Sequence, residues 1–210
     1  MSNLKSLSES LINGKADEVR RLTQEAIEAR MSPQQILNDG LVLGMAEVGR
    51  RFKNNEFYVP EVLIAARAMK AGMEILKPLL SDAGVKPAAK ILLGTVKGDL
   101  HDIGKNLVGM MLEGGGFEVV DLGVDVSPEK YIDAVRNNEV QVLGMSALLT
   151  TTMVNMKETI SALKNANVRD QVKVIIGGAP VTDQYATEIG ADGYAADAAS
   201  AVDLVKQLIG

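Results

Sequence analysis

From residue 88 onward, short apolar runs alternate with stretches of helical periodicity. The apolar runs occupy residues 90–96, 117–122, 140–145 and 172–176, with a weaker one at 192–195. Helical patterns lie at residues 104–113, 128–137, 151–165, 183–189 and 198–209. Short buried strands that alternate with helices are typical of a parallel sheet covered by helices on both faces. We therefore predict an α/β domain with a doubly wound, parallel, five-stranded sheet.

The part of the chain before this domain shows helical periodicity only. Helical patterns cover residues 4–12, 16–31 and 32–53, and a fourth pattern begins at Pro60 and continues to Leu76. Ser32 followed by Pro33 is a helix-start signal. Four helices with short connections predict a small four-helix bundle. The segment SDAGVKP at 81–87 predicts a linker, so we place the bundle at residues 1–83 and a flavodoxin-like (Rossmann-like) domain at 88–210, with 84–87 between them.

Composition excludes several classes of function. The 210 residues include no cysteine and a single histidine, so disulfides, zinc–thiolate sites and cysteine nucleophiles are excluded. A formal net charge of −5 and an aromatic content of 3% argue against binding to phosphate backbones or stacked bases. The N-terminal sequence lacks the apolar run of a signal peptide or a membrane span. We expect a cytoplasmic protein with neither nucleic acid nor membrane as a partner.

The single histidine, His101, lies where such a sheet binds its ligands. In doubly wound sheets the ligand site is beyond the carboxyl ends of the strands, which brings residues 97–104, 146–150 and 177–180 together. A lone histidine is more often structural than functional, but this one lies on a strand-to-helix loop beside Asp99 and Asp102. Neutral imidazole binds transition metals through one nitrogen, and Asp99 can accept the N–H of the other.

One histidine without cysteine cannot form a usual tetrahedral zinc site. We therefore expect a metal that arrives with most of its ligands already supplied, as it would in a macrocycle.

Three short motifs make this expectation specific. Residues 99–104 (DLHDIG) resemble the Asp-x-His-x-x-Gly motif of cobalamin-binding modules, Ser146-Ala147-Leu148 resembles their Ser-x-Leu, and Gly177-Gly178 their Gly-Gly. The resemblance implies a cobalamin or related corrinoid (methylcobalamin) bound base-off/His-on. His101 would be the axial cobalt ligand, and the nucleotide tail would lie in a groove beside the sheet. The implied cofactor-binding residues of this domain are Gly98, Asp99, Leu100, His101, Asp102, Ile103, Gly104, Ser146, Leu148, Thr150, Gly177, Gly178 and Ala198.

The helical part is similar to the cobalamin-binding region of methionine synthase. The similarity extends through residues 50–52 and 57–62, and it implies a cap in which Phe52 and Val59 cover the methyl group on cobalt. Both residues are equally compatible with a purely structural role in the bundle core. Two positions depart from methionine synthase: Thr152 replaces the serine of its His–Asp–Ser relay, and Asn38 replaces a glutamate that contacts the cofactor. Asp99 and Thr152 are the relay candidates, and no residue is predicted to be catalytic by itself.

The resemblance covers nearly the whole chain and implies a small corrinoid protein of a multi-component methyltransferase system. Such a protein carries a methyl group on cobalt between a substrate methyltransferase and a second methyltransferase, and a reductive activase is an expected third partner. The donor would be a methylamine, methanol, a betaine or an aryl methyl ether, and the acceptor tetrahydrofolate or a thiol coenzyme. The alternatives are a cobalamin-dependent sensor, a mutase subunit and a flavodoxin-like nucleotide binder without cobalt.

Overall fold

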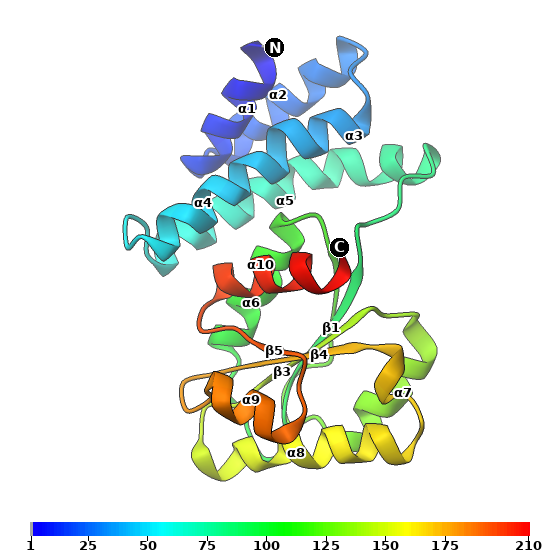
Figure 1. Ribbon diagram of the computed structural model, residues 1–210. Helices are drawn as coiled ribbons and strands as arrows, with labels where there is room; N and C mark the ends of the chain where they lie inside the picture. Colours follow the sequence, from blue (N-terminus) through cyan, green and yellow to red (C-terminus); the bar gives the residue numbers. More distant parts are fainter. Residues whose placement is uncertain (1) are drawn as a thin grey trace. The chain divides into compact units, whose positions relative to one another are not determined.

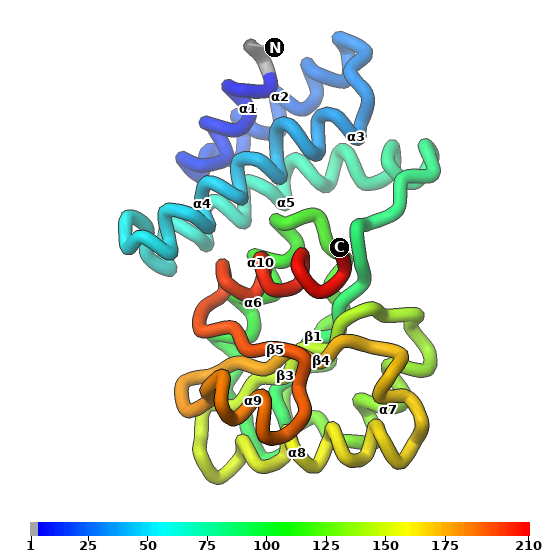
Figure 2. The backbone as a smooth tube through the Cα atoms, in the orientation of Figure 1, coloured from blue at the N-terminus to red at the C-terminus, as the bar shows by residue number. Residues whose placement is uncertain are grey.

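The computed structural model describes residues 2–210, and Figure 2 traces them. The chain divides into two compact units. The helical unit consists of residues 2–88 together with Glu113–Gly116, and the sheet unit consists of Ala89–Leu112 and Phe117–Gly210. Among the described residues, no helix is both long enough and apolar enough to cross a membrane.

The helical unit contains the four predicted helices, and the third is interrupted. Its elements are α1 (Ser2–Ile12), α2 (Ala16–Glu28), α3 (Pro33–Ile36), the π-helical segment η1 (Leu37–Val42), α4 (Leu43–Lys53) and α5 (Val59–Asp82). The predicted start of the third helix is confirmed, because Ser32 accepts a hydrogen bond from the Gln35 backbone N–H. Within the segment SDAGVKP, the expectation of a linker was wrong for Ser81 and Asp82, which form the end of α5, whereas the linker placed at residues 84–87 lies after that helix.

The π-helical segment was not predicted. It lies against α1, because a Cβ atom at Gly40 would come within 2.7 Å of the Leu7 side chain. Leu7, Ile36 and Leu41 are fully buried in this unit.

The sheet unit is a five-stranded parallel sheet in the order β2-β1-β3-β4-β5. The strands are β1 (Lys90–Thr95), β2 (Glu118–Asp121), β3 (Val142–Ser146), β4 (Lys173–Gly177) and β5 (Gly193–Tyr194). The helices are α6 (Ile103–Gly114), α7 (Pro128–Asn138), α8 (Thr150–Asn165), α9 (Asp183–Ile189) and α10 (Ala198–Ile209), with a short 3₁₀ turn at Arg169–Gln171 that was not predicted. The predicted fold class is confirmed, and element ends in this unit differ from prediction by at most two residues.

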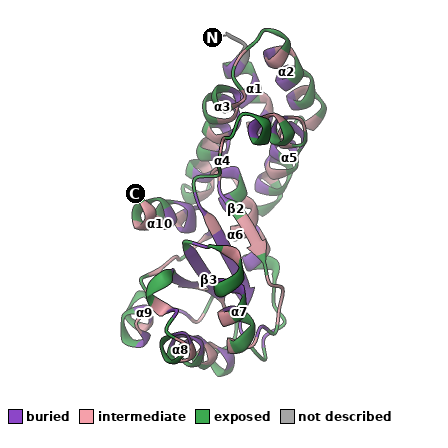
Figure 3. Ribbon diagram, turned by 90° about the vertical axis from the view of Figure 1, so that its right-hand side faces the viewer, coloured by how far each residue is buried: buried purple, intermediate pink, exposed green. Residues whose placement is uncertain are grey.

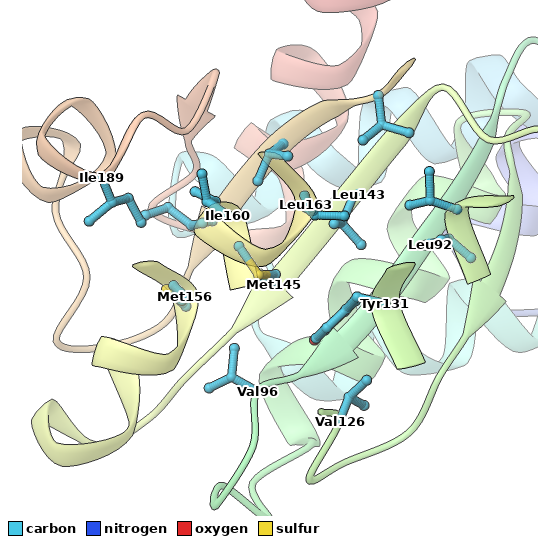
Figure 4. Close-up of a cluster of buried hydrophobic side chains, with 14 of the residues drawn as sticks. Leu92, Val96, Val126, Tyr131, Leu143, Met145, Met156, Ile160, Leu163 and Ile189 are labelled. Atoms are coloured by element: carbon cyan, nitrogen blue, oxygen red, sulfur yellow. The ribbon is translucent and has the colours of Figure 1, made fainter. Parts of the chain in front are cut away.

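Two helical layers enclose this sheet. Figure 1 shows α7, α8 and α9 on one face and α6 and α10 on the other. Alternate strand residues such as Leu92, Leu143 and Val174 pack against the first layer, where Tyr131 of α7 and Met156 of α8 are fully buried (Figure 4). The central strand β3 is almost entirely buried, whereas the edge strand β2 is half-buried or exposed (Figure 3). The strand order reverses between β1 and β3, which places the switch point at the carboxyl ends of these strands.

Candidate functional site

The loops that follow β1 and β3 are joined by hydrogen bonds at the carboxyl edge of the sheet. The Leu148 backbone N–H donates to Asp99 Oδ2 over 2.8 Å, although the two residues are 49 positions apart. The loop after β4 lies against the same segment, because a Cβ atom at Gly178 would fall 1.9 Å from the Ala147 carbonyl oxygen. The three segments predicted to meet at this edge therefore do so.

Asp99 is the buried centre of this arrangement, with a residue exposure of 1%. Its Oδ1 accepts hydrogen bonds from the His101 backbone N–H at 3.0 Å and from His101 Nδ1 at 2.7 Å. Its Oδ2 accepts from the Leu148 N–H at 2.8 Å and from Thr152 Oγ1 at 2.6 Å. Burial acts to raise the pKa of Asp99, but the hydrogen bonds from Thr152, His101 and Leu148 outweigh it and hold the pKa well below its usual range. Asp99 is therefore a carboxylate at neutral pH.

The ionised Asp99 fixes the tautomer of His101. A carboxylate only accepts hydrogen bonds, so Nδ1 carries the proton and Nε2 of the neutral ring keeps its lone pair. The His101 side chain is 50% exposed, whereas the Asp99 side chain is completely buried. The loop backbone is held as well, because Thr95 Oγ1 donates to the His101 carbonyl oxygen at 2.9 Å. The site thus presents one oriented nitrogen donor.

Thr152 occupies the predicted relay position, and its extra methyl group is accommodated. Its hydroxyl donates to Asp99 Oδ2, and its Cγ2 lies 3.8 Å from where a Cβ atom of Gly98 would be. The hydrogen bond expected between a threonine hydroxyl and Asp99 is therefore present. The methyl group makes no close contact with Gly98.

Packing within the protein explains why residues 177 and 178 are both glycine. Gly178 has a φ of +128°, and the adjacent Ala147 carbonyl leaves no room for a side chain. A Cβ atom at Gly177 would come within 3.1 Å of the Ala195 carbonyl oxygen. The resemblance to cobalamin-binding modules implies that both glycines are cofactor-binding residues. Packing between the loops after β3, β4 and β5 already requires them to be small.

The other predicted residues of the sheet unit lie in the loops after β1 and β3 or at the ends of strands and helices. Leu100, Ile103 and Leu148 are apolar yet 71%, 80% and 43% exposed. Asp102 is exposed and accepts a hydrogen bond from the Asn106 side chain at 3.0 Å. The rest lie at element ends: Ser146 ends β3, Thr150 begins α8, Gly104 is in the first turn of α6, and the buried Ala198 begins α10.

Three predicted positions belong to the helical unit. Phe52 lies in α4 and is half-buried, Val59 is the first residue of α5 and is 38% exposed, and Asn38 is exposed in η1. The connection between α4 and α5 is tied to α4 by Arg50, which pairs with both Glu47 and Glu56. The role of Phe52 and Val59 as a cap stays a prediction.

Several residues that were not predicted make contacts in or near the His101 loop. Asp125 Oδ1 accepts a hydrogen bond from the Gly98 N–H at 2.7 Å, and Asn155 Nδ2 donates to the Lys97 carbonyl oxygen at 2.9 Å. Lys105 is buried in the first turn of α6, and its ammonium group donates to both carboxylate oxygens of Asp121. These contacts join segments distant in sequence, and no single-sequence pattern signals them.

The site fits a large chelated metal better than a free ion. Within residues 2–210, no group of three or more histidine, cysteine or acidic side chains is arranged to hold a metal ion. A lone imidazole with a fixed tautomer can add only one axial ligand to a metal whose other positions are filled. The exposed apolar side chains of Leu100, Ile103 and Leu148 beside it match a broad, largely apolar ligand. The residues present therefore fit a corrinoid.

Comparisons with known proteins agree with this chemistry. A family model described as the B12 binding domain matches residues 89–203, and a second model with the same description matches residues 4–77. The chain is 41% identical to a corrinoid protein of Desulfitobacterium hafniense (strain Y51), over 100% of this chain and 99% of that protein. It is 42% identical to a dimethylamine corrinoid protein of Methanosarcina barkeri, over 98% of this chain and 97% of that protein.

Two solved structures share the fold across the chain. A cobalamin-binding protein from Desulfitobacterium hafniense DCB-2 aligns with a TM-score of 0.83 and 33% identity, covering 99% of this chain and 98% of that one. A chain of the methanol:cobalamin methyltransferase complex from Methanosarcina barkeri aligns with a TM-score of 0.89 and 31% identity, covering 99% and 80%. The protein therefore belongs to the B12-binding corrinoid proteins of multi-component methyltransferase systems.

Proposed function

We propose that this protein is a methyl carrier that binds its corrinoid base-off/His-on, with His101 Nε2 as the lower axial ligand of cobalt. When bound, the corrinoid supplies a cobalt centre that accepts a methyl group from one methyltransferase and gives it up to another. The single observation that carries the proposal is the 2.7 Å hydrogen bond between Asp99 Oδ1 and His101 Nδ1. Because Nδ1 holds the proton of this bond, the lone pair of Nε2 is available to a metal.

The residues around His101 adjust the strength of this donor. Asp99 makes the imidazole a stronger electron donor through its hydrogen bond to Nδ1. Thr152 and the Leu148 N–H hold Asp99 in place and ionised. The hydrogen bonds that hold His101 in the loop use Nδ1 and the backbone, and none of them uses Nε2. His101 can therefore bind or release cobalt without the loop losing its internal hydrogen bonds.

The names of the related proteins support the partners that we propose for this chain. One relative is a dimethylamine corrinoid protein, and one structural neighbour comes from a methanol:cobalamin methyltransferase complex. We propose a substrate:corrinoid methyltransferase, a second methyltransferase and a reductive activase as partners of this chain. Methylamines and methanol are supported as donor classes by these names, and betaines and aryl methyl ethers stay in the test panel. The acceptor is proposed to be tetrahydrofolate or a thiol coenzyme.

The test uses the fact that the protein has one histidine. The full chain is labelled with ¹⁵N-histidine, reconstituted with hydroxocobalamin and reduced to cobalt(II). An axial ¹⁴N ligand splits the electron paramagnetic resonance lines into triplets, and a ¹⁵N ligand splits them into doublets. We expect doublets in the labelled wild type and loss of histidine splitting in His101→Ala.

Methyl transfer is measured on the same preparations with the donor panel and co-purified partner enzymes. We expect His101→Ala to lose most of the transfer seen with wild type. Triplets that persist in the labelled wild type would mean that the cofactor's own base is the ligand. A colourless protein that ignores added cobalamin would favour the nucleotide-binder alternative.

A further inference from the structure

We propose that Asp125 is a positioning residue for His101, acting from the loop between β2 and α7. The inference deepens the proposed function and rests on it, since it concerns how the cobalt ligand is aimed. We call residues 96–102 the His101 loop and residues 122–126 the bracing loop.

The bracing loop runs along the end of β1. The Thr95 N–H donates to the Gly123 carbonyl at 3.0 Å, and the Val126 N–H donates to the Thr95 carbonyl at 2.9 Å. Val96 and Val126 form a parallel bridge beyond the last strand pair. The bracing loop thus lies directly beside the start of the His101 loop.

Asp125 forms hydrogen bonds with two consecutive residues of the His101 loop. Its carboxylate Oδ1 accepts from the Gly98 N–H at 2.7 Å, and its own N–H donates to the Asp99 carbonyl at 3.0 Å. These bonds hold the backbone on both sides of the Asp99 Cα atom. The direction of the Asp99 side chain, and with it the position of the oxygen that holds His101 Nδ1, depends on that backbone.

The geometry of both partners is specialised for this contact. Gly98 has a φ of +79° and Asp125 a φ of +52°, so each lies in the left-handed region. Aspartate tolerates that region better than most residues do, because its short side chain bonds locally. Both residues are exposed, so water would satisfy the Gly98 N–H if the carboxylate were absent. The bond is therefore not needed to satisfy a buried donor, and positioning is what it supplies.

Asp125 completes the support of Asp99 from a separate side. Leu148 and Thr152 hold the Asp99 carboxylate from the loop after β3 and from α8. Asp125 holds the Asp99 backbone from the loop after β2. The contacts to the Asp99 side chain keep the carboxylate ionised, whereas Asp125 sets the direction in which that side chain points.

The experiment reads the His101 tautomer in the ligand-free full chain. Long-range proton–nitrogen correlation spectra of ¹⁵N-histidine-labelled protein are recorded at about pH 8.5, where imidazole is neutral. Asp125→Gly removes the carboxylate but keeps the left-handed backbone and its N–H, and Asp125→Asn keeps the side-chain acceptor. Asp133→Ala removes an exposed acidic residue of α7 as the matched control, and Asp99→Asn shows the response to losing the carboxylate partner.

We expect the ratio of the Nε2–H to the Nδ1–H tautomer to rise about threefold to tenfold in Asp125→Gly, below the effect of Asp99→Asn. Asp125→Asn and Asp133→Ala should match wild type. An unchanged ratio in Asp125→Gly, with a clear response in Asp99→Asn, would overturn the proposal. So would unfolding of both Asp125 variants, which would assign the residue to fold stability.

A second measurement separates this inference from the proposed function. After reconstitution, His101 ligation of cobalt should weaken in Asp125→Gly by about threefold to tenfold, which is below the roughly tenfold to hundredfold effect of losing a direct hydrogen-bond partner of a metal ligand. If labelled wild type shows no histidine ligation while the tautomer response holds, the cobalt role fails and the positioning of His101 stands. If wild type shows ligation and the tautomer does not respond, only the role of Asp125 fails.

Discussion

A single buried carboxylate connects segments that lie far apart in the sequence. Asp99 accepts hydrogen bonds from its own loop, from the loop after β3 and from α8. Spacing within DLHDIG was enough to predict that Asp99 would face His101, because the two are neighbours in one loop. The bond from Thr152, 53 positions away, was predicted only through resemblance. Asp125 was missed because its contact depends on how two loops meet.

Replacing Asp99 by asparagine should destabilise the protein at neutral pH by about 2–3 kcal/mol, because hydrogen bonds to a buried carboxylate are strong. In addition, the amide NH₂ of asparagine would face groups that are themselves hydrogen-bond donors. The pKa of Asp99 is lowered in the fold, so its contribution is present above the ordinary value of 3.8 and is lost as pH falls further. Urea unfolding of wild type and Asp99→Asn between about pH 7 and pH 3 measures this.

The stability difference should be constant down to about pH 4 and should then shrink. A difference that stays constant to pH ~3 would contradict a lowered pKa at this residue. Asp133→Ala is the control, because it removes an exposed carboxylate from the same unit.

At the scale of elements, helix starts and strands were predictable, and helix interiors were less so. Ser32 with Pro33 and Ser127 with Pro128 mark helix starts, and both serines accept the expected backbone hydrogen bond. The π-helical turn at Leu37–Val42 was not predictable, because its apolar residues also satisfy ordinary helical spacing. Its Gly40 lies where Leu7 of α1 comes close, which is a tertiary contact.

The start of α6 is anchored by a buried charge. The side chain of Lys105 is 3% exposed, and it pairs with Asp121, whose side chain is 50% exposed. Asp121→Ala leaves the ammonium group with the Asn106 side chain, at 2.9 Å, as its one remaining hydrogen-bond partner among residues 2–210. We expect a loss of about 2 kcal/mol in the free energy of unfolding, below the 3–5 kcal/mol of fully buried pairs because Asp121 is half-exposed.

The double variant Lys105→Met/Asp121→Ala removes the stranded charge and should recover part of that loss. Urea unfolding of wild type, Asp121→Ala, Lys105→Met and the double variant gives a complete double-mutant cycle. Additive effects of the two substitutions would show that the pair is not coupled.

For the whole molecule, the sequence predicted two parts, and both match models of B12 binding domains. Alternation of strands and helices led to the correct class of sheet, because a parallel sheet requires crossover helices. The sequence does not identify a methyl donor, since in the proposed function the donor binds to a partner methyltransferase.

Cobalamin should stabilise the whole protein by an amount that rises with the logarithm of its free concentration once that concentration exceeds Kd. A ligand that binds only the folded state at a hundredfold excess over its Kd adds about 2.7 kcal/mol. Thermal unfolding with increasing hydroxocobalamin should therefore show a rising midpoint in wild type and a smaller rise in His101→Ala. Equal rises in the two proteins would show that His101 adds nothing to binding.

The hydrogen bonds of Asp99 also bear on mismetallation. Each of its oxygens already accepts two hydrogen bonds, so the carboxylate has no lone pair to offer a stray cation. His101 Nε2 alone chelates nothing, and a single imidazole holds aqueous zinc or nickel weakly. The same bonds that aim His101 therefore discriminate between metals by how they are delivered: free ions in the cell find one ligand, whereas a metal enclosed in its own ring needs only that one.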